Sequence, residues 1–379
     1  MECYNKIEDS IAFALNNIKS QVNMLAEVRG YESPLMMTLE QSTMKKETLD
    51  AMLSAMREYM PKFHEYLKAK AQMLGHKNGL PWYDLFAPIG SLDKKYSLEE
   101  ARDYLVDSFR SFSADMAEMM ETAFHESWID FYPHAGKVGG AFCSNLSSIK
   151  QSRILSNYDG SFNAVDTLAH ELGHAYHGMQ IENNLPLNLD YSMPVAETAS
   201  TFNETHITKK AIAEAVGDEK LALLENLLSN TTQTICDIYS RYLFESEVFE
   251  QCKDRFLMAE DLKEIMIQAQ KEAYGDGLDH DVLHPYMWAC KGHYYSESLS
   301  FYNFPYAFGA LFSMGLYTMF EKEGEAFVPK YREMLKNTPM TSVEGAAKIV
   351  GVDLTKPDFW RASLEGFAQL IDEFISLSK

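Results

Sequence analysis

The stretch Thr167–Met179, T-L-A-H-E-L-G-H-A-Y-H-G-M, places three histidines and one glutamate within two helical turns of a mostly apolar segment. Histidine is otherwise scarce, with 11 in a chain of 379 residues. His170 and His174 are four residues apart, so an α-helix would bring both imidazoles to one face, with about 5–6 Å between their Cβ atoms. A pair of imidazoles at this separation is typical of a metal site.

The glutamate inside the pattern indicates catalysis as well as binding. Glu171 lies one position round the helix from His170, where it could reach a water at the metal without ligating the ion. H-E-x-x-H on a helix is the arrangement of a zinc site with a general base. The alternative is a buried helix whose histidines are only hydrogen-bonded. The apolar neighbours favour a site, because the polar face of the helix must then bind something buried.

A third ligand is predicted in V-A-E-T-A-S-T-F-N-E, where Glu197 follows His174 by 23 residues. That interval allows a turn and an antiparallel second helix, on which Ser200 and Glu204 project to the same side as Glu197. We expect Glu204 to accept a hydrogen bond from a ligand imidazole, with a solvent-facing Glu204 as the alternative. His177 shares the face of the paired histidines, but a fourth protein ligand would close the site, so we interpret it as a neighbour.

Three protein ligands leave one position open on the ion. Zinc lowers the pKa of a water in such a position to about 7, and Glu171 would take the proton as hydroxide attacks a carbonyl. Two imidazoles and one carboxylate suit zinc better than manganese or cobalt, so one Zn²⁺ per chain is predicted.

An uncharged segment supplies candidate donors for the oxyanion. Ser298–Phe320 is long enough to cross a bilayer, but it contains Asn303, a proline and several tyrosines, so we predict a buried protein segment. His293, Tyr302 and Tyr306 are hydrogen-bond donors in these apolar surroundings. A buried aromatic helix is the alternative, and the zinc motif favours donors that face a developing negative charge.

The composition indicates a globular chain and excludes some partners. The net charge is −21, from 34 Lys+Arg against 55 Asp+Glu, whereas nucleic acid or an anionic membrane would require a positive face. Five cysteines without C-x-x-C spacing indicate free thiols in a reducing compartment. The acidic start M-E-C-Y-N-K-I-E-D is unlike a signal peptide, so a cytoplasmic location is expected.

The apolar spacing predicts a mainly α-helical chain. Ser97 and Glu100 form a predicted capping box at the start of one helix. Helices are predicted over Asn16–Val28, Thr48–Leu74, Leu98–His125, Leu221–Leu257 and Ala259–Tyr274.

The composition changes between Phe131 and Gly160, where the sequence is rich in glycine and turn residues and has only short apolar runs. Two strands of a small antiparallel sheet are predicted there. Asn163 is the expected cap of the motif helix, which should end near Asn183, and a further helix should begin near Pro194.

Three blocks of the sequence together resemble a known family. T-L-A-H-E-L-G-H-A-Y-H, A-E-T-A-S-T-F-N-E and H-Y-Y-S-E-S-L-S-F-Y-N-F-P-Y-A-F-G, in this order, are similar to the signatures of the thimet oligopeptidase and oligoendopeptidase F family of zinc peptidases. The resemblance implies a thermolysin-like catalytic fold with a channel that admits short peptides. It also implies that His170, His174 and Glu197 bind zinc and that Glu171 is the base.

The same resemblance implies roles outside the metal site. His293 and Tyr302, nine residues apart, match the transition-state donors of the family. Tyr306 follows Tyr302 by four residues, as in the oligoendopeptidase F branch, whereas the gap is three in the thimet branch. K-V-G-G-A-F-C resembles the strand that lies along the substrate.

Family members are typically much longer and have an N-terminal helical region in the channel wall. We therefore expect a single catalytic domain over 1–379, with 1–130 as a helical part of the wall and 131–379 as the zinc-binding core and C-terminal helices. Three explanations for the shorter chain stay open. Most of the family's N-terminal region is truncated here, or a second chain supplies that part of the wall, or this protein works with a more open cleft than its longer relatives.

The leading hypothesis is a zinc endopeptidase that cleaves oligopeptides. A fragment that binds zinc or peptide with little turnover is the alternative, and an exopeptidase working through an open cleft is a third. The sequence does not indicate an oligomeric state.

Overall fold

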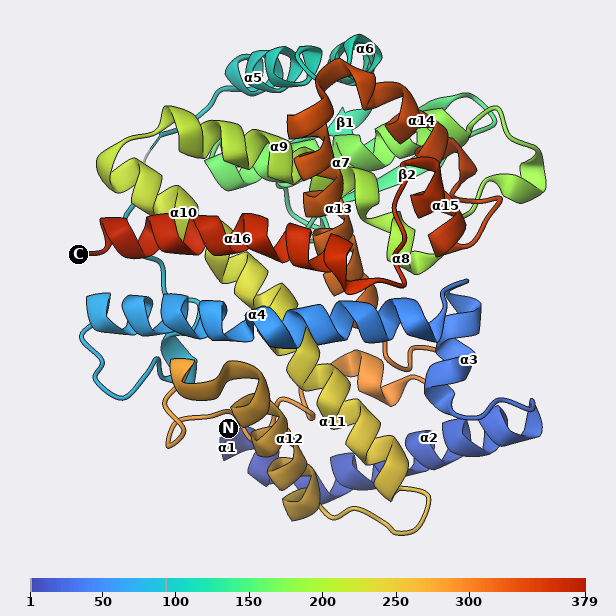
Figure 1. The fold of residues 1–379 in the computed structure, drawn as a ribbon, viewed down its shortest axis with the longest axis vertical. Helices are drawn as coiled ribbons and strands as arrows, with labels where there is room; N and C mark the ends of the chain where they lie inside the picture. The colour runs from blue at the N-terminus through green and yellow to red at the C-terminus, as the bar shows by residue number, and fades with distance from the viewer. Residues whose placement is uncertain (1, 93) are drawn as a thin grey trace. The chain divides into compact units, whose positions relative to one another are not determined.

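The computed structural model describes residues 2–92 and 94–379, and the chain is mainly helical with one small sheet (Figure 1). Its contacts divide it into two compact units that interleave along the sequence. Unit 1 comprises Met1–Ile89, Leu228–Ala307 and Phe367–Lys379. Unit 2 comprises Gly90–Leu227 and Phe308–Gly366. The single catalytic domain expected from the sequence, divided at residue 130, stays a prediction.

Unit 1 is built from long amphipathic helices. Its helices are α1 (Glu2–Asn5), α2 (Glu8–Val28), α3 (Pro34–Gln41), α4 (Lys46–Met73), α11 (Ile238–Gln251) and α12 (Ala259–Tyr274). Short 3₁₀ turns are η1 (Trp82–Asp84), η4 (Gly275–Gly277) and η5 (Gly292–Tyr295), and η3 (Gln233–Asp237) is a π-helical turn that leads into α11. The predicted helix over Leu221–Leu257 is therefore interrupted at η3, whereas Ala259–Tyr274 is confirmed.

The core of unit 1 lies where α2, α11 and α12 pack together, around the buried residues Leu15, Phe244 and Trp288. A charged pair crosses this core, with Lys19 Nζ 2.6 Å from a carboxylate oxygen of Glu245 and both side chains almost fully buried. A buried pair of this kind adds little net stability, because desolvation offsets the attraction, but removing one partner would leave an unpaired buried charge between α2 and α11.

Unit 2 contains the sheet, whose strands are β1 (Ile129–Asp130), β2 (Phe142–Leu146) and β3 (Gln151–Leu155). The strand order is β1-β3-β2, and β2 pairs with β3 in antiparallel register, as predicted. The prediction of a purely antiparallel sheet is wrong, because β1 pairs with β3 in parallel. β1 has only two residues, too few for a periodic pattern, and precedes the predicted segment.

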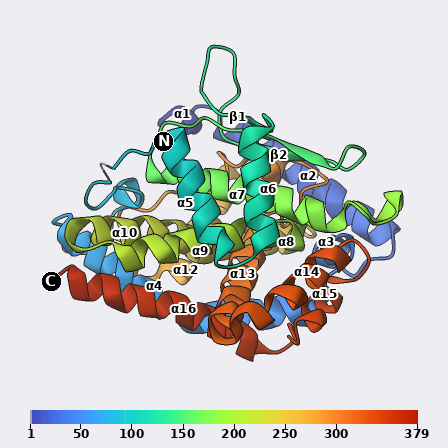
Figure 2. The same ribbon diagram turned by 90° about the horizontal axis from the view of Figure 1, so that it is seen from above.

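The helices of unit 2 are α5 (Leu98–Arg110), α6 (Ala114–His125), α7 (Phe162–Ile181), α8 (Met193–Ala196), α9 (Thr198–Glu214), α14 (Val328–Asn337) and α15 (Val343–Ile349), with 3₁₀ turns η2 (Pro186–Asn188) and η6 (Gly324–Ala326). Helices α10 (Gly217–Thr232), α13 (Phe304–Glu323) and α16 (Pro357–Leu377) contribute to both units. The helix predicted over Leu98–His125 is two helices, α5 and α6, which pack against each other (Figure 2).

Capping side chains explain where two of these helices begin. Ser97 and Glu100 form the predicted capping box of α5. The prediction of Asn163 as the cap of α7 is wrong: Ser161 caps the helix, and its hydroxyl accepts a hydrogen bond from the Ala164 N–H at 3.1 Å. Both residue types favour this position, so sequence preference alone does not choose between them.

Helix α7 is the central element of unit 2 and packs along α9, beside which it lies in Figure 1. The contact is closest at Gly173, where a Cβ atom would lie 2.5 Å from the Ala199 carbonyl oxygen and 2.6 Å from the Ser200 Cα. Only a residue without a side chain allows the two backbones to approach this closely.

The uncharged segment Ser298–Phe320 is mainly buried and forms most of α13. Across residues 2–92 and 94–379, no helix combines the length and the apolar character that a bilayer span requires.

We predict that Gly173→Ala destabilises the protein by about 1–3 kcal/mol, because the new methyl group meets the backbone of α9, which cannot move aside as a side chain can. Gly366→Ala in α16 is the matched control. Its Cβ would meet the end of the flexible Met314 side chain at 3.2 Å, so the gain in helix propensity should leave stability unchanged or raised. Urea denaturation measures both, and equal midpoints for the two variants would refute the close contact.

Candidate metal centre

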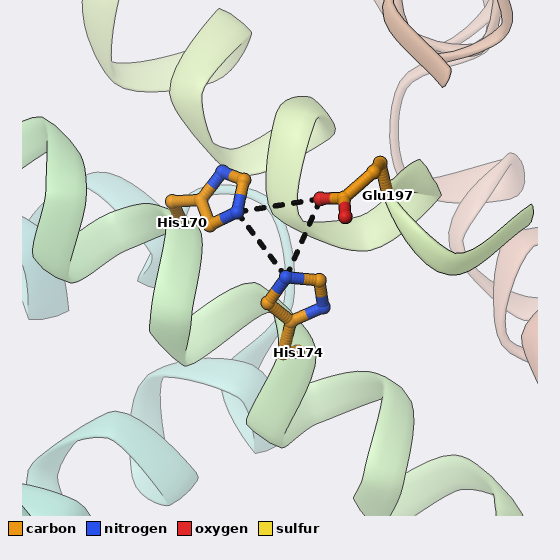
Figure 3. A group of neighbouring side chains, drawn as sticks. All are labelled: His170, His174 and Glu197. Carbon is orange, nitrogen blue, oxygen red and sulfur yellow. Dashed lines mark hydrogen bonds and ion pairs between the residues drawn. The ribbon is translucent and has the colours of Figure 1, made fainter. Parts of the chain in front are cut away.

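The candidate site is formed by α7 and by the junction between α8 and α9 in unit 2. His170 and His174 project from successive turns of α7, while Glu197 is the residue between α8 and α9 (Figure 3). Pro194 lies at the start of α8, where a proline is favoured, so the predicted helix start is confirmed. Gly309 of α13 lets that helix approach the Glu197 side chain, since a Cβ there would lie 2.9 Å from the Glu197 Cβ.

Three candidate ligand atoms converge in the cluster of Figure 3. The Nε2 atoms of His170 and His174 are 3.2 Å apart, and the Glu197 Oε2 atom lies 3.3 Å from the first and 3.4 Å from the second. Tetrahedral zinc with bonds of 2.0–2.1 Å to nitrogen and oxygen would separate its ligand atoms by about 3.3–3.4 Å. The three atoms therefore lie at nearly the spacing that one tetrahedral ion requires.

The electrostatics of the cluster also suit a cation. Burial would raise the pKa of the Glu197 carboxyl, but the two imidazoles outweigh this effect and hold the pKa well below its usual range. Burial disfavours protonated His170, but Glu197 and Glu204 raise its pKa well above the usual value. A metal ion competes with protons for these atoms, so its affinity should fall as the pH falls.

Two polar side chains form hydrogen bonds with the candidate ligands and orient them. Glu204 lies with one carboxylate oxygen 2.9 Å from His170 Nδ1, which is the predicted acceptor geometry and not the solvent-facing alternative. Ser200 donates its hydroxyl to Glu197 Oε2 at 2.9 Å. Such contacts select the tautomer and the rotamer of a ligand side chain and strengthen its hold on a metal.

Two further residues near the site were not predicted from the sequence. Asn145 of β2 donates its amide to the His174 carbonyl oxygen at 3.3 Å, which joins the sheet to α7. Asp166 accepts a hydrogen bond from the Thr208 hydroxyl at 3.3 Å and links α7 to α9. Asp166 is one helical turn before His170, and this spacing could have indicated that it lies near the site. The sequence around Asn145 contains no pattern that would have indicated its contact with α7.

Glu171 is buried, and burial raises the pKa of its carboxyl. Together with His170 and Glu204 it lines a cavity of about 390 Å³, which Gly140 and Ala141 border from the segment leading into β2. The predicted base therefore shares one cavity with a predicted ligand and with the segment that leads into the edge strand β2.

His177 is on the same helix but lies outside the cluster. Its Nε2 atom is 2.7 Å from the Thr338 hydroxyl, and its ring stacks on Tyr191 with centroids 4.0 Å apart. Burial lowers its pKa to about 3, so the ring is neutral. These contacts describe a packed core histidine.

The three predicted donors lie together in unit 1. The rings of His293 and Tyr302 have centroids 5.5 Å apart, and the Tyr302 and Tyr306 hydroxyls are 2.6 Å apart. The structure thus groups the donors with one another, and their role in a reaction stays a prediction.

Comparisons with known proteins identify the family. A family model described as Peptidase family M3 matches residues 1–366. The chain is 26% identical over 379 residues to Oligopeptidase PepF of Bacillus subtilis, covering 99% of this chain and 56% of the relative.

Solved structures share the fold. A candidate peptidase of Chlamydophila abortus superposes with a TM-score of 0.88 at 23% identity, covering 99% of this chain and 63% of the other. For oligoendopeptidase F of Enterococcus faecium the TM-score is 0.75 at 19% identity, covering 99% and 61%. The chain thus spans between 56% and 63% of the length of these relatives, and the predicted fold class and family resemblance are confirmed.

We predict that Glu204→Ala weakens zinc binding about 10–100-fold, because the imidazole of His170 loses the acceptor that orients it. Competition against a chromophoric chelator at fixed pH measures the affinity. Glu214→Ala, near the far end of α9, should leave the affinity unchanged. Equal affinities for wild type and Glu204→Ala would show that the contact does not support the metal.

Proposed function

The chain belongs to peptidase family M3, and we propose that it is a zinc-dependent endopeptidase that hydrolyses peptide bonds within short oligopeptides. The observation that supports this most strongly is the convergence of two imidazole nitrogens and one carboxylate oxygen at separations of 3.2–3.4 Å, beside the buried Glu171. The donor set of His170, His174 and Glu197 is that of catalytic zinc sites with an open position.

A zinc ion held by these residues would act as a Lewis acid that polarises the scissile carbonyl and makes an attacking water acidic near neutral pH. Glu171 accepts the proton of that water and then delivers it to the leaving amine. Glu171 is next to His170 on α7 and lines the same cavity, which supports a role beside the ion and not as a fourth ligand.

Charge that develops on the carbonyl oxygen requires hydrogen-bond donors. We assign this role to His293 and Tyr302, with Tyr306 bonded to Tyr302 as a third group. Preorganised donors of this kind contribute about 10²–10³-fold to the rate per donor.

The edge strand β2 supplies a surface for the peptide backbone. Among the described strands it pairs with β3 alone, and the segment that leads into it, at Gly140 and Ala141, borders the cavity that contains Glu171. An extended peptide that pairs with an edge strand gains main-chain hydrogen bonds whatever its side chains. Such binding suits a hydrolase of varied short peptides.

The alternative is a protein that binds zinc or peptide with little turnover. The observation behind it is that the chain spans 56% of its Bacillus subtilis relative. An exopeptidase, the third possibility, would release terminal residues, so product masses from an internally quenched peptide distinguish it from an endopeptidase.

Glu171→Gln should lower the rate of chelator-sensitive cleavage about 10²–10⁴-fold, because the amide cannot accept a proton. The zinc content should stay at one per chain, since Glu171 is not a ligand. Rates with an internally quenched peptide, with and without chelator, and metal analysis of the same preparations check this. A variant as active as wild type would exclude Glu171 as the base, and an inactive wild type that binds zinc would favour the alternative.

His293→Ala and Tyr302→Phe should each lower kcat about 10–1000-fold while the zinc content stays unchanged, because each removes a donor to the oxyanion but no metal ligand. Tyr83→Phe, at an exposed tyrosine of η1, is the control for loss of a phenol. Unchanged kcat in both variants would show that the donors lie elsewhere.

A further inference from the structure

The segment that carries Tyr302 is held against α11 by two charged side chains. Glu245 and Arg241 are one helical turn apart on α11, so they project from the same face. Glu245 contacts Phe301 and Arg241 contacts Asn303, which are the residues on either side of Tyr302.

The contact of Glu245 stabilises an unfavourable backbone conformation. Phe301 has φ 55°, in the left-handed region that a bulky residue rarely adopts without support from its surroundings. Its N–H donates to Glu245 Oε2 at 2.9 Å, and the other carboxylate oxygen of Glu245 accepts from buried Lys19. A buried charged group therefore holds the backbone at the residue just before Tyr302.

A chain of hydrogen bonds links Arg241 to His293. The Arg241 guanidinium donates to the Asp237 carboxylate and to the side-chain oxygen of Asn303. The Asn303 amide nitrogen lies 2.9 Å from His293 Nε2. Asp237 is the last residue of the π-helical turn η3, and all four side chains belong to unit 1.

The donor and acceptor roles in this chain have one consistent assignment. A guanidinium can only donate, so the oxygen of the Asn303 amide faces Arg241 and its NH₂ group faces the imidazole. The NH₂ group also can only donate, so His293 Nε2 must accept. A neutral imidazole that accepts at Nε2 has its proton on Nδ1.

We propose that Arg241, held by Asp237, is a positioning residue that orients the Asn303 amide and thereby sets His293 in the tautomer with a protonated Nδ1 and an unprotonated Nε2. On the proposed function, this tautomer makes the Nδ1–H group the donor that His293 offers to the oxyanion. Asp237, Arg241 and Asn303 thereby join the groups on which the rate depends.

The surroundings also keep the ring neutral. Burial, and then the positive charges of Arg241, Lys19 and Lys291, lower the pKa of His293 to about 4. A neutral ring has one N–H group, so its two tautomers expose different nitrogens as donors. The amide of Asn303 decides between them.

The test is the ¹⁵N NMR spectrum of the imidazoles in the full chain at pH 7, with His293 assigned by comparison with His293→Gln. We expect a neutral ring with a protonated Nδ1 and an unprotonated Nε2 in the wild type. In Asn303→Asp the introduced carboxylate keeps the contact with Arg241 but can only accept, so Nε2 should become protonated. Both charged pairs on α11 remain, so this variant should fold.

Arg241→Met should give a mixture of the two tautomers, because the freed amide can rotate, and Arg241→Lys should restore part of the wild-type signal because lysine is also only a donor. Asn17→Asp on the exposed face of α2 adds the same charge and should change neither the spectrum nor the rate. A wild-type ring protonated on Nε2, or an Asn303→Asp spectrum like that of the wild type, would overturn the proposal.

Kinetics test the link to catalysis separately. Asn303→Asp should lower kcat about 10–1000-fold with KM and zinc content nearly unchanged, because a donor used only in the transition state is lost. A switched tautomer with an unchanged kcat would overturn the catalytic part of the inference. If the wild type itself shows no chelator-sensitive cleavage, the proposed function fails, while the spectra still decide the tautomer.

Discussion

The close approach of α7 and α9 is the constraint on which the candidate site depends. Gly173 permits it, because any side chain at this position would collide with the backbone of Ala199 and Ser200. Glu197 lies at the start of α9, so the same approach brings its carboxylate to the paired imidazoles of α7. A wider spacing between these helices would leave two imidazoles and a distant acid, which is a much weaker site for a cation.

Each of the two units contains polar side chains that orient a titratable group or its neighbour. In unit 2, Glu204 orients the ring of His170, and Ser200 orients the carboxylate of Glu197. In unit 1, Arg241 orients Asn303, which contacts His293. In both units, polar neighbours contact a titratable side chain of the predicted site, directly or through one further residue. Such partners add little stability, but they narrow the geometries and tautomers that the site samples.

On the proposed function, the sheet contributes mainly through its edge. Asn145 joins β2 to α7 by donating to the His174 carbonyl, so the strand is linked to the helix that carries two of the candidate ligands. The outward-facing residues of β2 are exposed, whereas Cys143 and Asn145 face inward. On the proposed function, a peptide paired with this strand would lie close to the cavity that contains Glu171, because Gly140 and Ala141, just before β2, border that cavity.

The sequence by itself determined the paired histidines, the adjacent glutamate and the third acid, because i, i+4 spacing follows from helix geometry whatever surrounds the helix. The motif blocks also sufficed to identify the family. Only the tertiary structure decided that β1 pairs in parallel, that Ser161 caps α7, and that Arg241 reaches Asn303. The strand pairing and the Arg241 contact join residues that are far apart in the sequence, so they depend on how the chain packs. The cap of α7 depends on a choice between two residues with similar local preference, and no local sequence pattern makes that choice.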